Sequence, residues 1–175
     1  MIALAAARAQ ESQINTVLVA STTGATALAV LQAVKGKRIV SVTQHSGYDE
    51  PDSLQWPEQA LRAFEAGGGT RFTGSHAFFG VARAVRQKWG TYLLEEIVAS
   101  TLRLFGEGMK VCCEISMMAA DAGLIRTDEE VLVIAGSGRG ADTAVVTVPV
   151  NLSRFFELRI REILCMPRPA AEDAR

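Results

Sequence analysis

The sequence is poor in cysteine, in net charge and in long apolar runs. Its three cysteines, Cys112, Cys113 and Cys165, are odd in number and show no Cys-x-x-Cys spacing, which argues against a disulfide framework and favours a reducing cytoplasm. A net charge of -1 over 175 residues gives no electrostatic reason to expect a nucleic acid or an anionic membrane as partner. Apolar runs are too short to span a membrane.

Patterns typical of metal sites and activated nucleophiles are missing as well. The two histidines, His45 and His76, make a poor metal site, so we expect none. A Ser-His-Asp or Cys-His arrangement is not evident, and the adjacent Cys112 and Cys113 are typical of a core. The first predicted strand ends in Ala20-Ser21, without an acidic phospho-acceptor, which excludes a receiver domain.

What is present indicates one globular α/β domain. Apolar residues make up 49% of the chain and charged residues 21%, as in ordinary globular proteins. We predict a single domain over residues 1–175, with a leading helix within 1–14 and a frayed tail at 168–175. The apolar patterns predict strands at residues 15–20, 38–43, 70–73, 131–135 and 144–148. They predict helices at residues 24–34, 56–66, 78–89, 91–105 and 109–122, and residues 158–165 are expected to be extended.

Strand–helix alternation predicts a three-layer α/β/α fold around a mostly parallel sheet. Right-handed crossovers place the first three strands on one side, and the long helical return brings the fourth strand to the other side of the first. Eight residues separate the fourth and fifth strands, too few for a helical crossover, so this pair should be antiparallel. The strand order therefore reverses between the first and fourth strands, where such sheets bind ligands.

Residues 21–26, Ser-Thr-Thr-Gly-Ala-Thr, link the first strand to a helix. Free backbone N–H groups and the helix dipole favour an anion at such a position, and Gly24 lets a phosphate approach the backbone. The alternative is an ordinary helix N-cap, which also prefers serine and threonine. One hydroxyl residue suffices for a cap, and this loop has four.

Residues 136–143 form the second glycine-rich loop, after the fourth strand. Gly136, Gly138 and Gly140 alternate, but a strand follows instead of the helix of a dinucleotide fingerprint. The pattern favours a backbone nest with Arg139 as a bidentate phosphate clamp, and Asp142 is placed to hold the loop by a turn-type bond. The alternative is a flexible hairpin with a solvated arginine. Both loops are expected to face each other across one crevice.

Six stretches of the chain match the sequence pattern of a known family, namely residues 19–24, 74–76, 110–115, 118–123, 139–144 and 163–168. On these stretches the chain resembles a family of small archaeal and bacterial proteins related to the C-terminal domain of pyruvate kinase. The resemblance implies a five-stranded mixed sheet of order 3-2-1-4-5 with strand 5 antiparallel, bound flavin mononucleotide (FMN) and no assigned reaction. In pyruvate kinase the two matching loops hold the phosphates of an allosteric sugar bisphosphate. The chain departs from the family in a shorter leading segment and at residues 136–138.

The resemblance implies an FMN site at the carboxyl edge of the sheet. Its phosphate-binding residues would be Ser21, Thr22, Thr23, Gly24, Ala25 and Thr26 with Gly138, Arg139, Gly140, Ala141, Asp142 and Thr143. Its other residues would be Thr43, His45, Gly47, Ser75, His76 and Glu114. Both histidines are alternatively structural hydrogen-bonding groups, and the buried carboxylate of Glu114 alternatively belongs to a salt bridge or a cap.

Two functions stay open at the level of sequence. The first is an FMN-binding protein, which could be a flavin-dependent oxidoreductase. The second is a regulatory or sensor module that binds a phosphorylated metabolite without catalysis. The apolar helices between residues 78 and 122 also predict a homo-oligomer.

Overall fold

In the computed structural model of the protein, residues 1–11, 13–138 and 140–168 are described. They contain one six-stranded sheet of order β3-β2-β1-β4-β5-β6. Its strands are β1 (Thr16–Ala20), β2 (Arg38–Val42), β3 (Thr70–Phe72), β4 (Val131–Ala135), β5 (Thr143–Val148) and β6 (Arg159–Cys165). Its helices are α1 (Ile2–Glu11), α2 (Ala25–Ala33), α3 (Glu58–Ala66), α4 (Gly80–Trp89), α5 (Leu94–Leu102) and α6 (Glu107–Asp121). Two 3₁₀ helices, η1 (Arg103–Phe105) and η2 (Leu152–Glu157), complete the elements.

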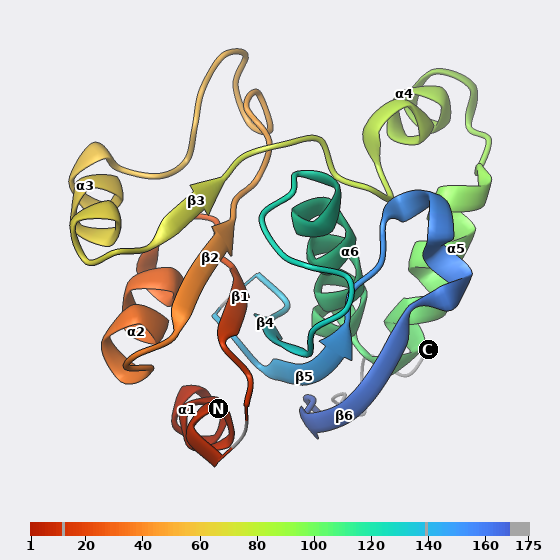
Figure 1. The fold of residues 1–175 in the computed structure, drawn as a ribbon. Helices are drawn as coiled ribbons and strands as arrows, with labels where there is room; N and C mark the ends of the chain where they lie inside the picture. Colours follow the sequence, from red (N-terminus) through yellow and green to blue (C-terminus); the bar gives the residue numbers. More distant parts are fainter. Residues whose placement is uncertain (12, 139, 169–175) are drawn as a thin grey trace.

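Helices cover both faces of the sheet, which confirms the predicted three-layer arrangement. Figure 1 shows α1, α2 and α3 on one side and α4, α5 and α6 on the other. Each side has its own buried cluster, one around Phe64, Trp56 and Val30 and one around the methionines and cysteines of α6. The central strands β1 and β4 are buried on both faces, which explains their unbroken apolar sequences.

The order of the first five strands agrees with the prediction. β1 pairs in parallel with β2 on one side and with β4 on the other, so the strand order reverses between β1 and β4. β4 and β5 are antiparallel, as the short connection between them requires. The predicted extended segment at residues 158–165 is confirmed as β6.

The prediction of a five-stranded sheet was wrong, because β6 joins the sheet as a sixth strand. β6 pairs antiparallel with β5, with register shifts at two places. Its burial alternates between exposed and half-buried over most of its length, although Arg161 and Glu162 are consecutive charged residues. Such a pattern is typical of an edge strand with one covered face, and it gives no sign of which partner the strand will take.

The segment around α5 differs from the helix predicted over residues 91–105, whose apolar residues were expected on one covered side. Leu94 and Ile97 are exposed, whereas Glu96 is buried and pairs with Arg86 of α4, Nε to Oε1 3.1 Å. The predicted helix over residues 91–105 is in fact α5 followed by η1. A salt bridge between the helices therefore lies buried at the start of α5, next to apolar side chains that are exposed. Among the described residues, no helix is both long and apolar enough to cross a membrane.

Candidate functional site

A cavity of about 460 Å³ opens at the carboxyl ends of β1, β2 and β4. This is the switch point of the sheet, and the volume lies in the usual range for small-molecule pockets. The two glycine-containing loops meet here, as predicted. Ten of the predicted site residues line the cavity, namely Ser21, Thr22, Thr23, Ala25, Thr26, Thr43, His76, Glu114, Gly138 and Gly140.

The loop at residues 21–26 leads from β1 into the first turn of α2. Ser21 Oγ accepts a hydrogen bond from the Ala27 backbone N–H at 3.3 Å, so this hydroxyl does contribute to capping the helix. The N–H groups of Ala25 and Thr26 have no acceptor among the described residues. They are the free donors that a helix N-terminus presents to an anion. The cap that the sequence left as an alternative is therefore present, beside two backbone donors that stay open.

Trp56 fixes this loop from outside the motif. Its indole Nε1 donates a hydrogen bond to the Ser21 carbonyl at 2.8 Å. Gly24 has φ 89°, and a Cβ on it would lie 3.0 Å from the Trp56 ring. A side chain at Gly24 would therefore meet both backbone strain and an immobile ring, because Trp56 also packs edge-on against Phe64.

Asp142 holds the loop at residues 136–143, as its turn chemistry predicts. Its Oδ2 accepts hydrogen bonds from the Ser137 N–H at 3.1 Å and the Ser137 hydroxyl at 2.8 Å. Its Oδ1 accepts one from Thr143 Oγ1 at 2.7 Å. A Cβ on Gly108 would overlap the Thr143 side chain, so the start of α6 packs directly against this loop. Asp142 is thus a structural residue of the loop.

Helix α6 forms a charged wall of the cavity. Lys110 lies between Glu107 and Glu114, with Nζ 3.3 Å from Glu107 Oε1 and 3.0 Å from Glu114 Oε2. Lys110 and Glu114 are both only 2% exposed. Glu114 Oε1 also accepts the Phe78 N–H at 3.0 Å, and Arg103 pairs with Glu107. The salt-bridge alternative for Glu114 is therefore present, at a position that also lines the cavity.

Burial and charge around the cavity shift the pKa values of two lining residues. Burial lowers the pKa of His76 below its ordinary value, against the opposing charge of Glu114. Burial by itself would raise the pKa of Glu107, but the hydrogen bond from Arg103 and the charge of Lys110 outweigh it and lower the value. At neutral pH the cavity lining therefore contains a neutral imidazole at His76 and an ionised carboxylate at Glu107.

Seven predicted site residues do not line the cavity. Four of them belong to the two loops but do not line the cavity, namely Gly24, Ala141, Asp142 and Thr143. Gly47 forms a turn with Ser53. His45 contacts the His76 ring, with centroids 5.4 Å apart. Ser75 lies in a second, shallower hollow with Phe72 and Met118. Arg139 falls outside the described residues.

Outside the two loops, sequence reasoning missed five polar or aromatic residues that line the cavity, namely Gln44, Tyr48, Phe79, Glu107 and Lys110. Lys110 and Glu114 stand four residues apart in an otherwise apolar helix, and this spacing is a signal for a buried pair. Tyr48 and Phe79 lie in separate segments after β2 and β3, where nothing in the sequence links them. Gln44 Oε1 is buried and has no hydrogen-bond partner among the described residues.

The adjacent cysteines of α6 are ordinary core residues, as predicted. Cys112 and Cys113 are buried. Burial raises the pKa of the Cys113 thiol to about 12 and that of Cys112 well above its usual range. Both are therefore protonated and unreactive at neutral pH.

In the part of the chain that the structure describes, no three His, Cys, Asp or Glu side chains are grouped to hold a metal ion.

The fold and the cavity define an open α/β domain whose switch point holds a small-molecule-sized cavity. The chain belongs to the family of the pyruvate kinase alpha/beta domain, which matches residues 1–147. A pyruvate kinase from Cryptosporidium parvum is similar over 85% of this chain, with 11% identity and a TM-score of 0.41. A Cryptosporidium parvum pyruvate kinase in complex with ADP is similar over 83%, with 12% identity and a TM-score of 0.39. The chain spans 22% of the length of each.

Proposed function

We propose that this chain binds a phosphorylated small molecule, with the phosphate between the loops at residues 21–26 and 136–143. The observation that supports this most is the meeting of both loops at one cavity. The free N–H groups of Ala25 and Thr26 and the hydroxyls of Thr22 and Thr23 are donors of the kind that bind phosphate oxygens. Arg139 would supply the compensating charge, since its sequence neighbours Gly138 and Gly140 both line the cavity.

FMN is the ligand that we propose for the site, on the basis of the family resemblance of the loops. The chain's own residues would bind its phosphate and provide walls for its ring, and the flavin would supply any redox chemistry. The buried, unpartnered Oε1 of Gln44 fits a ligand that brings a hydrogen-bond donor into the cavity.

The alternative function is a sensor that binds a phosphorylated metabolite without catalysis. One observation favours it: the described charged groups of the cavity wall, Glu107, Lys110 and Glu114, are paired with one another. Groups committed in this way are poorly placed to transfer protons. The colour of the purified protein separates the two functions, because a colourless protein that also fails to bind added FMN would leave the sensor.

Arg139→Ala tests the phosphate assignment. Charge-assisted hydrogen bonds contribute on the order of 1.5–3 kcal/mol each, so this change should weaken FMN binding by roughly one to two decades. Riboflavin lacks the phosphate, and its binding should change little. Titration of both ligands against both proteins is the measurement. The exposed Arg126, at the other end of the sheet with Asp128 and Glu129 as partners, provides a matched control in Arg126→Ala. Equal losses for both ligands would contradict the assignment.

We also propose that the chain forms a homo-oligomer. Large apolar side chains are exposed along α4, α5, η1 and η2, including Val81, Leu94, Leu104 and Phe156. A second copy of the chain would cover such a surface. Light scattering at micromolar concentration should give more than the monomer mass, and Leu94→Glu should lower it. Leu54→Glu, on an exposed loop residue, is the control, and a monomeric wild type would contradict the proposal.

A further inference from the structure

The side of the cavity that follows β2 and β3 is built from aromatic rings. Tyr48 comes from the loop after β2, whereas His76 and Phe79 come from the segment after β3, and all three line the cavity. The His76 ring centroid lies 6.2 Å from that of Tyr48 and 5.9 Å from that of Phe79. His45 adds a fourth ring behind them. Residues far apart in the sequence thus form one aromatic wall.

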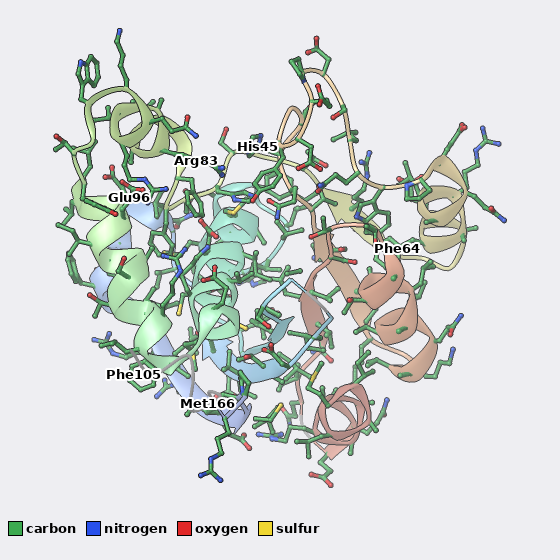
Figure 2. All side chains as sticks on the ribbon, turned by 180° about the vertical axis from the view of Figure 1, so that it is seen from behind. His45, Phe64, Arg83, Glu96, Phe105 and Met166 are labelled. Carbon is green, nitrogen blue, oxygen red and sulfur yellow. The ribbon has the colours of Figure 1, made fainter. Side chains whose placement is uncertain are left out.

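Two cations hold these rings in place. Lys110 Nζ lies 4.6 Å from the centroid of the Phe79 ring. The Arg83 guanidinium of α4 lies 5.7 Å from Phe79 and 5.4 Å from Tyr48. Figure 2 shows Arg83 and His45 at the same end of the molecule. Cation–π contacts on both rings restrict their motion, so the wall is organised before any ligand arrives.

Apolar side chains and one amide also line this side of the cavity. Val111, Ile115 and Met118 of α6 line the cavity next to the rings, and a methionine sulfur packs well against aromatic faces. Gln44 lines the same cavity, and its buried Oε1 has no partner among the described residues. Apolar walls with one unsatisfied acceptor suit a flat ring that carries an N–H donor at its edge.

The carboxylates of the wall are poor acceptors for a sugar. Glu114 accepts hydrogen bonds from Phe78 and Lys110, one at each oxygen. Glu107 is paired with Arg103 and Lys110. A hydroxylated chain placed against these engaged oxygens and the rings would gain few new hydrogen bonds, whereas a flat ring in the same place would gain contact area.

We propose that Tyr48, His76 and Gln44 form a ring subsite, so that the cavity selects the phosphate ester of a planar heteroaromatic compound over an aliphatic sugar phosphate. Tyr48 and His76 bind one face of the ring, and Gln44 accepts a hydrogen bond from its edge. Arg83 and Lys110 are positioning residues, which act through Tyr48 and Phe79. The selection between phosphate esters rests on the proposed function, whereas the ring subsite itself is independent of the phosphate loops.

Three probes separate the two ends of the cavity: FMN, riboflavin and ribose 5-phosphate. Calorimetric titration of the wild type should rank FMN first, riboflavin second and ribose 5-phosphate last. Tyr48→Leu keeps apolar bulk but removes the aromatic face, and it should weaken FMN and riboflavin by about tenfold, the effect of one lost stacking contact. Gln44→Leu should weaken the same two probes and leave ribose 5-phosphate unchanged.

Tyr92→Leu is the matched control, because Tyr92 is exposed, carries Arg86 on its ring and does not line the cavity. Ribose 5-phosphate that binds as tightly as FMN would overturn the ring subsite and leave the phosphate site standing. A second outcome is that riboflavin binds more weakly to Tyr48→Leu while Arg139→Ala binds FMN normally. This outcome would support the ring subsite and overturn the phosphate site. Failure of all three probes to bind would overturn both.

Discussion

The two sides of the cavity are stabilised by different interactions. The side after β1 and β4 consists of small residues fixed by local hydrogen bonds, such as Trp56 to the Ser21 carbonyl and Ser137 to Asp142. The side after β2 and β3 consists of large rings fixed by charges, with Lys110 between two carboxylates and against Phe79. The first side therefore leaves backbone donors open at its surface. On the second side the charged groups pair with one another, and the aromatic rings line the cavity.

This contrast shows how one cavity can separate binding strength from selectivity. Open N–H groups at a helix terminus attract an anion of almost any shape. Rings that are held rigidly accept flat ligands and reject others, because desolvation must be matched by close packing. Variants that weaken one side and leave the other intact can test whether the division holds.

The largest effect is expected from Lys110→Met, which breaks the charged side. The side chains of Lys110 and Glu114 are each 3% exposed, so the change leaves a buried carboxylate without its cation. Loss of one partner of a buried pair costs about 3–5 kcal/mol. Urea unfolding should show a loss of this size. Removing both charges in Lys110→Met with Glu114→Leu should restore part of the stability, because no unpaired charge then stays buried.

Arg62→Met is the control for this prediction. Arg62 and Glu58 have the same four-residue spacing on α3, but both side chains are about three-quarters exposed, at 76% and 74%. Exposed pairs of this kind contribute about 0.3–0.5 kcal/mol. A Lys110→Met variant as stable as Arg62→Met would show that charge does not hold the aromatic side.

A smaller effect is expected from Gly136→Ala, which disturbs the loop side. A Cβ on Gly136 would overlap the Gly140 carbonyl oxygen, so the loop must open. We expect a loss of about 1–3 kcal/mol in the free energy of unfolding. The affinity for FMN should fall more than the affinity for riboflavin. Gly123→Ala is the control: it adds strain at φ 69° in open space, and it should lower stability without changing affinity. Unchanged FMN binding in Gly136→Ala would contradict the phosphate assignment.

The loop side could be predicted from the sequence and the aromatic side could not. Residues 21–26 form one contiguous stretch, and the strand order alone brings residues 136–143 opposite it. Tyr48, Phe79 and Lys110 come from three segments, and only their packing in the folded chain makes them neighbours. The spacing of Lys110 and Glu114 signals a buried pair, but nothing in the sequence places Lys110 against the ring of Phe79.

The sheet shows the same limit on prediction. Order and direction of the first five strands follow from connection lengths and from the handedness of crossovers. The place of β6 does not follow from either, because a half-buried alternating strand fits any free edge. The buried Glu96 of α5 was also out of reach, since its partner Arg86 belongs to another helix.

The smallest effect is expected from pH, through His76 on the aromatic side. Burial lowers the pKa of His76 in the folded chain, and the charges of Lys110, His45 and Arg83 act in the same direction, against Glu114. Above the ordinary imidazole pKa of about 6.5, both the folded and the unfolded chain are neutral at this residue. Below that value the unfolded chain binds the proton first, so stability should fall as the pH falls.

His76→Gln should remove this part of the pH dependence. Urea unfolding at about pH 7.5 and about pH 5.5, on either side of the ordinary imidazole pKa, measures it. The wild type should lose more stability between the two than His76→Gln does, because glutamine binds no proton. The pKa of Glu107 is also lowered, but the stability that its ionisation contributes is lost only below the ordinary carboxyl range. It therefore does not interfere between these two pH values. An equal loss in both proteins would mean that His76 is as well solvated as an unfolded histidine. The aromatic side would then be open to water, and a ring bound there would gain little from desolvation.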